Sequence, residues 1–236
     1  MTDLEVIVKD GPHTTEGFEY YNGDAQPFYW QSIHSEDPND YFRDRYFEED
    51  NIYFVQYNSC WGKELEEKFG SKDDAKHMPS FEAFKGRVLE TIREKDVDKL
   101  IVDLRYNGGG SSPQGTRFVE ELAATEINRK GHLFVAISNQ TFSSAVINTM
   151  NFIQLTEAII VGEPTGGSPN HYGEVRTLVL PKTNLEIYHS TNYFKYVDED
   201  MEAVFPDFSI QSTFAAFESG EDPVYEFVKN FSDEEQ

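Results

Sequence analysis

The chain has 236 residues, of which 20 are lysine or arginine and 43 are aspartate or glutamate, so its formal net charge is −23. This length is enough for one large domain with its own core, and the 38% hydrophobic and 14% aromatic content excludes a disordered acidic chain. The charge excludes a general binder of nucleic-acid backbones and disfavours adhesion to an anionic membrane, because both need a basic face.

Several other classes are excluded by what the sequence lacks. The single cysteine, Cys60, excludes an intrachain disulfide and a cysteine-based zinc site, and its flanks predict a structural thiol at the end of a strand. The six histidines show no HExxH pattern, so we expect no metal and no cofactor. No apolar run approaches the roughly 18–20 residues of a membrane span, and no signal peptide is visible, so a complete chain would be cytoplasmic by default.

The first 50 residues look different from the remainder. Residues 1–50 are acidic, aromatic-rich and irregular apart from a short strand expected over Leu4–Val8. We expect this segment to be the remnant of an upstream domain, and residues 51–232 to form the regular domain.

From residue 51 the hydrophobic pattern becomes regular. Ile52–Tyr57 is a predicted strand, and Ser80 is a predicted N-cap for a helix with an apolar face. Three strongly apolar stretches then read as buried strands separated by helices, which predicts right-handed crossovers and a mainly parallel sheet. The buried strands are Leu100–Leu104, Leu133–Ile137 and Ala158–Gly162. One helix is indicated by the apolar residues Phe81, Phe84, Val88 and Ile92, and a second by Phe118, Val119, Leu122 and Ile127. A third helix is expected over Ser143–Leu155.

The C-terminal part adds a hairpin and a helix. Val175–Leu180 and Leu185–His189 are predicted to pair as a β-hairpin, and Pro223–Phe231 is predicted to be the last helix. The expected fold class is therefore α/β, with a mainly parallel sheet, a C-terminal hairpin and a C-terminal helix.

Two polar features follow successive buried strands. Gly108, Gly109 and Gly110 end one strand, and Thr141–Ala145 joins the next strand to a helix. In open α/β sheets, ligands bind beyond the carboxyl ends of the strands. Ser143 at this junction is either a helix N-cap or a nucleophile, and the glycine loop could face it as a source of oxyanion donors, which is an arrangement suited to acyl transfer.

Four stretches in this order resemble the serine peptidases that comprise the C-terminal-processing (tail-specific) proteases and the catalytic core of tricorn-type proteases. The resemblance covers roughly residues 50–230. It implies a ClpP/crotonase-like core of ββα units that cleaves peptides or proteins through an acyl-enzyme. The stretches are KLIVDLRYNGG at 99–109, TFSSA at 141–145, IVGEPTGG at 160–167, and FPD at 205–207 with GEDP at 220–223.

The resemblance also implies roles for individual residues. Ser143 matches the nucleophile of the family. The oxyanion hole would be formed by the Ser144 N–H and by an N–H of Gly108 or Gly109.

The general base is where this chain departs from the lysine-dyad branch of the family. Gly166-Gly167-Ser168 stands where that branch has its lysine, and Lys182 falls in the predicted hairpin turn. The chain therefore resembles the branch with a histidine base. Three alternatives stay open: His171, His13, or a base outside this chain, which would then be the C-terminal part of a longer enzyme. The remaining histidines have surface or strand contexts: His34, His77, His132 and His189.

Charged residues near these motifs are harder to assign. Asp103 and Arg105 are predicted to form a structural ion pair beneath the glycine loop, because a buried charge needs compensation. Several carboxylates could orient a histidine, and they are Glu163, Glu174, Glu202 and Asp207. For Asp207, a structural turn is an equal alternative to a catalytic role.

Two other functions compete with the peptidase. The first is a catalytically inactive domain that binds a peptide or small molecule, favoured by the missing lysine. The second is an acyl-CoA enzyme of crotonase type, disfavoured because no basic cluster for CoA phosphates accompanies the glycine loop.

Overall fold

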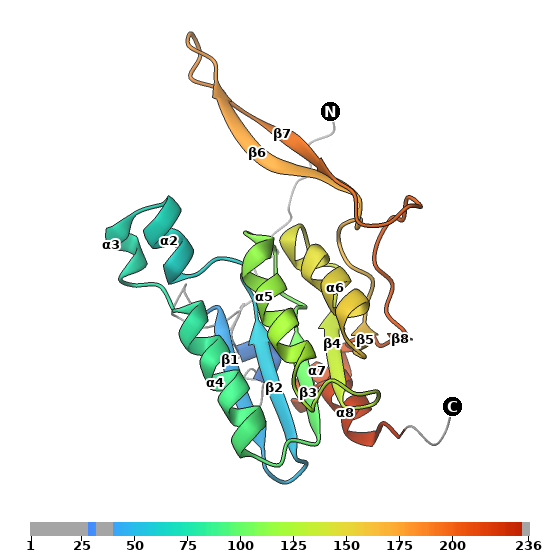
Figure 1. Ribbon diagram of the computed structural model, residues 1–236. Coiled ribbons are helices and arrows are strands. Elements are labelled where there is room, and N and C mark those ends of the chain that lie inside the picture. Colours follow the sequence, from blue (N-terminus) through green and yellow to red (C-terminus); the bar gives the residue numbers. More distant parts are fainter. Residues whose placement is uncertain (1–27, 32–39, 233–236) are drawn as a thin grey trace, which may run out of the picture.

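The computed structural model describes residues 28–31 and 40–232, and the strand expected over Leu4–Val8 lies outside them. Its centre is a six-stranded sheet in the order β1-β2-β3-β4-β5-β8 (Figure 1). β1 is antiparallel to β2, and every other neighbouring pair is parallel. The predicted α/β class with a mainly parallel sheet is therefore confirmed. The strands are β1 (Phe42–Phe47), β2 (Ile52–Tyr57), β3 (Lys99–Asp103), β4 (Leu133–Ile137), β5 (Ile159–Gly162) and β8 (Phe208–Ser209).

Helices cover both faces of this sheet. On one face, α4 (Phe81–Glu94), α5 (Ser112–Ala123) and α6 (Ser144–Leu155) pack against alternate strand residues, and they lie in front of the sheet in Figure 1. On the other face, α1 (Phe28–Gln31) and α8 (Pro223–Asn230) cover the intervening strand residues. Because β3, β4 and β5 are buried on both faces, they read as nearly continuous apolar runs.

Three further short helices were not expected from the sequence. They are α2 (Lys63–Phe69), α3 (Lys72–Ala75) and α7 (Phe214–Ser219). α2 and α3 are charged and bury almost no side chains, so they carry no apolar stripe that would have revealed them.

The N-cap residue and the spacing of apolar residues account for α4. The Ser80 side chain accepts a hydrogen bond from the Ala83 N–H, and Phe81, Phe84 and Val88 are buried on one face of α4. α5 differs from expectation in its bounds: it begins at Ser112, and Ile127 is buried beyond its end.

The described part of the segment before residue 51 contains two regular elements that the sequence did not reveal, the short helix α1 and the strand β1. β1 pairs with β2 over its whole length, so residues 42–47 belong to the central sheet rather than to an irregular segment. Its residues Arg43, Asp44 and Arg45 are charged because β1 is an edge strand, and this composition masks a strand from periodicity analysis.

The predicted hairpin is present and longer than expected. β6 (His171–Val179) and β7 (Glu186–Phe194) form a separate two-stranded antiparallel sheet that projects from the globular part (Figure 1). Across the described ranges, no helix combines the length and the apolar character that crossing a bilayer requires.

Candidate active site

Ser143 lies at the junction between β4 and α6 in a strained backbone conformation. Its φ of 52° and ψ of −121° are unfavourable for a residue with a side chain. It occupies the N-cap position of α6, yet its side chain makes no capping hydrogen bond. Its Oγ has no hydrogen-bond partner among the described residues, and the side chain is half-exposed. The N-cap interpretation of this serine is thus not supported by its contacts.

The glycine loop after β3 packs directly against this serine. Gly109 has a φ of +107°, and a Cβ placed on it would lie 2.8 Å from the Ser143 Cβ and 3.0 Å from the Ser144 nitrogen. No other residue type fits that space without displacing the Ser143 turn. Close approach of the loop to Ser143 is thus the reason that position 109 requires glycine.

A buried asparagine fixes the shape of this loop. The Asn107 Oδ1 accepts a hydrogen bond of 2.9 Å from the Gly109 N–H, and its Nδ2 donates to the Tyr57 carbonyl oxygen at 2.8 Å. The Asn107 carbonyl oxygen accepts from the Phe142 N–H at 3.0 Å. Asn107, which is fully buried, therefore links the end of β2, the glycine loop and the residue before Ser143. No motif or periodicity in the sequence marks Asn107 for this role.

Some main-chain N–H groups near Ser143 donate a hydrogen bond to another group of the protein, and others have no acceptor. The Gly109 N–H is engaged by Asn107, so it is not free to bind an oxyanion in this conformation. Ser144 is the first residue of α6, where N–H groups lack helical acceptors. Within the described residues, the N–H groups of Ser144, Gly108 and Gly110 have no acceptor. Gly110 also lines the cavity beside Ser143, although only Gly108 and Gly109 were predicted as oxyanion donors of this loop.

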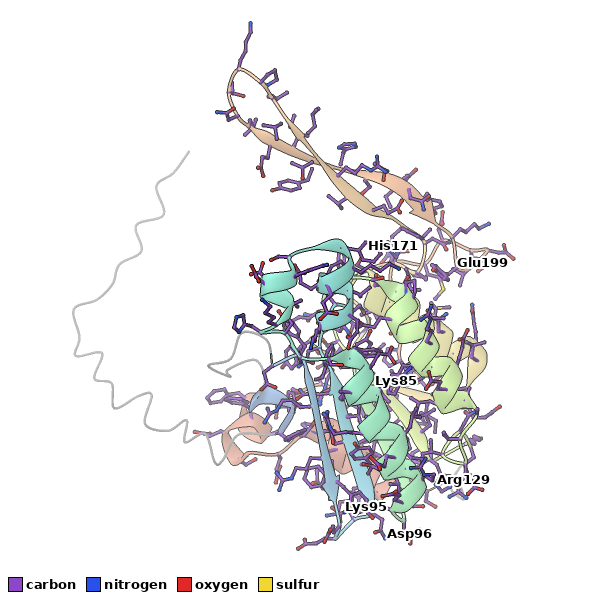
Figure 2. All side chains as sticks on the ribbon, turned by 60° about the vertical axis from the view of Figure 1, so that its left-hand side comes forward. Lys85, Lys95, Asp96, Arg129, His171 and Glu199 are labelled. Carbon is purple, nitrogen blue, oxygen red and sulfur yellow. The ribbon has the colours of Figure 1, made fainter. Side chains whose placement is uncertain are left out.

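A cavity of about 670 Å³ opens beside Ser143. The base of the hairpin forms one wall, so β6 brings His171 into the same cavity, and Figure 2 labels His171 where the hairpin joins the globular part. The apolar and aromatic lining comes from both the globular part and the hairpin: Trp61, Phe142, Ile147, Tyr172, Val175 and Phe194.

The hydrogen bonding of His171 defines its tautomer. Its Nδ1 lies 2.9 Å from the Ser168 carbonyl oxygen, which can only accept, so Nδ1 carries the proton. In the neutral ring, Nε2 then holds the lone pair that a general base needs. The ring also packs against Phe194, with 5.7 Å between ring centroids.

The other candidates fall in different places. His13 lies outside the described residues. Lys182 is exposed in the turn between β6 and β7, and it does not line the cavity beside Ser143. The Asp207 carboxylate accepts from the Ile160 N–H at 2.8 Å, which is a structural contact at β5. Glu174 lines the cavity, and no hydrogen bond joins it to His171 in the part of the chain that is described.

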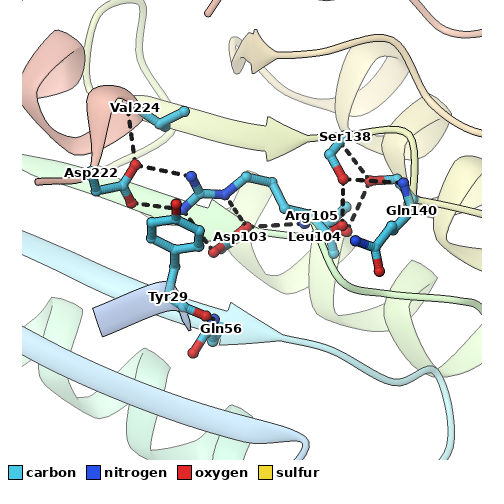
Figure 3. Close-up of polar contacts among 10 residues, drawn as sticks. Tyr29, Gln56, Asp103, Leu104, Arg105, Ser138, Gln140, Asp222 and Val224 are labelled. Atoms are coloured by element: carbon cyan, nitrogen blue, oxygen red, sulfur yellow. Dashed lines mark hydrogen bonds and ion pairs between the residues drawn. The ribbon is translucent and has the colours of Figure 1, made fainter. Parts of the chain in front are cut away.

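The predicted pair of Asp103 and Arg105 is confirmed, and it is part of a larger buried cluster (Figure 3). The guanidinium donates to Asp103 and, through both terminal nitrogens, to Asp222 at 2.9 and 2.7 Å. It also lies 3.9 Å from the Tyr29 ring centroid. The two carboxylates raise the pKa of Arg105 even though burial opposes its charge. This cluster anchors α1 and α8 beneath the glycine loop.

Cys60 is a structural thiol, as expected. It is fully buried, and burial raises its pKa to about 12, so it is no nucleophile near neutral pH. Among the described residues, no three histidine, cysteine, aspartate or glutamate side chains are grouped so that they could hold a metal ion.

No protein-family model and no curated protein sequence matches this chain. Solved structures do share its fold. A proposed peptidase from Parabacteroides merdae superposes with a TM-score of 0.55 at 17% identity, over 79% of this chain and 62% of that chain. Mature CPAF in complex with lactacystin gives 0.53 at 13% identity, over 75% and 51%. A proposed S41 protease from Bacteroides fragilis gives 0.50 at 14% identity, over 83% and 56%.

These comparisons define the class of scaffold. The chain has a peptidase-like α/β fold of the kind found in an S41 protease. It spans between about half and three-fifths of the length of these three neighbours.

Proposed function

We propose that this chain is the core of a serine-type peptidase of the C-terminal-processing and tricorn-like type, which cleaves peptide bonds through an acyl-enzyme on Ser143. The observation that carries the proposal is the strained, uncapped Ser143 at a strand-to-helix turn, half-exposed in a cavity and packed against a glycine loop. Backbone strain of this kind costs about 1–3 kcal/mol and is concentrated at functional sites.

The chemistry follows from the groups around this hydroxyl. Attack of the Ser143 Oγ on a peptide carbonyl produces an oxyanion, which the Ser144 N–H at the start of α6 would bind together with an N–H of Gly108 or Gly110. Loss of one such donor reduces the rate by about 10²–10³-fold. The Ser144 hydroxyl donates to the Gly110 carbonyl oxygen at 2.8 Å, which joins the two donor segments.

Two sources of the base are proposed. His171 shares the cavity with Ser143 and keeps Nε2 free to accept a proton. The alternative is a base supplied from outside this chain, which is consistent with the shorter span of the chain relative to its structural neighbours. His13 stays a candidate of the sequence alone.

A peptide-cleavage assay tests the proposal. Peptides of mixed sequence are incubated with this chain and with any longer product of its gene, and their fragments are identified by mass. We expect cleavage that Ser143→Ala abolishes and that Ser111→Ala, in the same cavity, preserves. If His171 is the base, His171→Ala abolishes cleavage while the hairpin control His189→Ala does not. Absence of cleavage by both products would refute the peptidase proposal.

A catalytically inactive binding domain is the second candidate. It is favoured by one observation: in the described residues, no hydrogen bond joins Ser143 or His171 to a partner that would activate either of them. This candidate predicts that extended peptides bind without being cleaved and that Ser143→Ala leaves their affinity unchanged.

A further inference from the structure

The strand β6 is interrupted at Glu174, at the base of the hairpin. Its neighbours Gly173 and Val175 pair with Asn192 and Ser190 of β7, whereas Glu174 has no partner in this ladder. Its φ of 53° is a backbone conformation that glutamate seldom adopts. Strained residues of this kind persist only where the surrounding structure holds them, and they are concentrated at active sites and ligand-binding sites.

Contacts with β7 hold Glu174 in this conformation. The Thr191 hydroxyl donates to the Glu174 carbonyl oxygen at 2.7 Å. Gly173 packs so closely against Phe194 that a Cβ placed on it would lie 2.9 Å from a carbon of that ring. Neither contact involves the Glu174 side chain, so the carboxylate can be replaced without removing the contacts that shape the backbone.

The interruption accompanies an unusual arrangement of side chains around the Ser143 cavity. In a regular strand, successive side chains point to opposite faces. Here all five residues from His171 to Val175 line the same cavity. Glu174 therefore joins His171 in the cavity wall, although the two residues are an odd number of positions apart on β6.

Glu174 supplies the negative charge of this cavity. Among the described residues that line it, Glu174 is accompanied by no aspartate, no second glutamate, no lysine and no arginine. Its carboxylate makes no hydrogen bond and no ion pair with any other described residue. A carboxylate on the wall of a cavity, with no cation of the protein beside it, favours a ligand group of positive charge.

Aromatic rings of the same cavity indicate which cation fits. Tyr172 and Phe142 line the cavity and are exposed by 73% and 53%, so their faces are available to a ligand. A guanidinium stacks on aromatic faces and binds a carboxylate through two parallel hydrogen bonds, whereas an ammonium is a compact and strongly hydrated charge. An arginine side chain therefore suits these groups better than a lysine side chain does.

We propose that Glu174 is a specificity-determining residue, which selects peptides that carry an arginine side chain at one position in the Ser143 cavity. Lysine is the second choice, and an acidic side chain is disfavoured there because two carboxylates would face each other. The inference rests on the proposed function, because its ligand is the peptide substrate of Ser143. Glu174 has no part in bond cleavage.

Peptide binding to the Ser143→Ala chain tests this selection without requiring cleavage. The probes are fluorescein-labelled peptides of alanine and serine in which arginine, lysine, glutamine or glutamate occupies each position in turn, and fluorescence anisotropy measures their affinities. At one position, arginine should bind about three- to tenfold more tightly than glutamine, as expected for one charge pair with a stacked ring in a partly enclosed site. Lysine should follow arginine, and glutamate should bind most weakly.

Two glutamate variants of the same chain provide the matched comparison. Glu174→Gln should remove the preference for arginine over glutamine, whereas Glu186→Gln, on β7 and outside the cavity lining, should retain it. Glu174→Lys should invert the order, so that the glutamate peptide binds more tightly than the arginine peptide. Raising NaCl from about 50 mM to about 500 mM should weaken the preference when Glu174 is present, because salt screens the charge pair.

The outcomes distinguish this inference from the peptidase proposal. An arginine preference that Glu174→Gln leaves unchanged overturns the inference, and so does the absence of any such preference or of any binding. Cleavage that depends on Ser143 but shows no arginine preference refutes only the role of Glu174. An arginine preference that depends on Glu174, in a protein that cleaves no peptide, refutes only the peptidase proposal.

Discussion

At the scale of single residues, the glycine loop and Ser143 form one unit. Gly109 approaches the Ser143 turn closely, whereas Gly108 has open space around its Cβ position and an ordinary φ. Asn107 holds the loop in this shape through contacts to Tyr57 and to the backbone before Ser143. The arrangement explains why two adjacent glycines should respond differently to the same substitution.

We expect Gly109→Ala to lower the free energy of unfolding by about 2–4 kcal/mol. The new methyl group would contact Ser143 and Ser144, and alanine is disfavoured at a φ of +107°. Gly108→Ala should change the same free energy by less than about 1 kcal/mol. Urea denaturation of the two variants measures both values. Equal stability of the two variants would contradict the close packing described here.

The unit formed by the glycine loop and Ser143 was only partly predictable from the sequence. Ser143 and the glycines were identifiable because each follows an apolar strand, but the partner of the Gly109 N–H was not. A side chain that accepts a hydrogen bond from the N–H two residues further along leaves no periodic signal. The role of Asn107 is therefore visible only in the three-dimensional structure. The same holds for Asp222, which completes the charge cluster around Arg105 from 117 positions away.

At the scale of elements, α8 is joined to the β1–β2 turn by a polar contact. The Tyr225 hydroxyl donates to Asp50 at 2.7 Å, and Lys229 lies 3.1 Å from the same carboxylate. The Tyr225 hydrogen bond, followed by Lys229, holds the pKa of Asp50 below its ordinary value of 3.8. The ionised carboxylate therefore helps to hold α8 on its face of the sheet.

This contact predicts a pH-dependent difference in stability. Because the folded-state pKa of Asp50 is depressed, its stabilisation is present above about pH 4 and is lost as the pH falls through the folded value. At pH 7, Asp50→Asn should lower the free energy of unfolding by about 0.5–1.5 kcal/mol, and this difference should shrink below pH 3.

Denaturant titrations of both proteins between pH 2.5 and 7 measure that difference. The control is Asp73→Asn, which removes a pair with Lys76 that is almost fully solvated and should have little effect. A difference between Asp50→Asn and the unmodified protein that stays constant with pH would contradict the assignment.

Element prediction succeeded for elements with a regular pattern of buried apolar residues, and it failed for β1, α2 and α3. The three central parallel strands and α4 carry strong apolar patterns, and their expected positions agree with the structure. Edge strand β1 and the solvated helices α2 and α3 carry charge instead. Periodicity reports on burial, so elements with little burial were not predictable from it.

At the scale of the whole molecule, an acidic α/β globule carries a charge-balanced hairpin whose base lines the Ser143 cavity. The sheet brings the glycine loop and Ser143 together at the carboxyl ends of adjacent strands, as the order of elements predicted. The hairpin adds His171 to the cavity, which the sequence could offer only as one of three alternatives. Whether this arrangement makes Ser143 a nucleophile is the central question.

The most direct measurement is covalent labelling with a fluorophosphonate, which reacts with activated serines. The protein and any longer product of its gene are treated at neutral pH, and the adduct is located by intact mass and peptide mapping. We predict one adduct on Ser143, absent in Ser143→Ala and retained in Ser111→Ala. No adduct on either product, or an adduct on another serine, would contradict the assignment of Ser143 as the nucleophile.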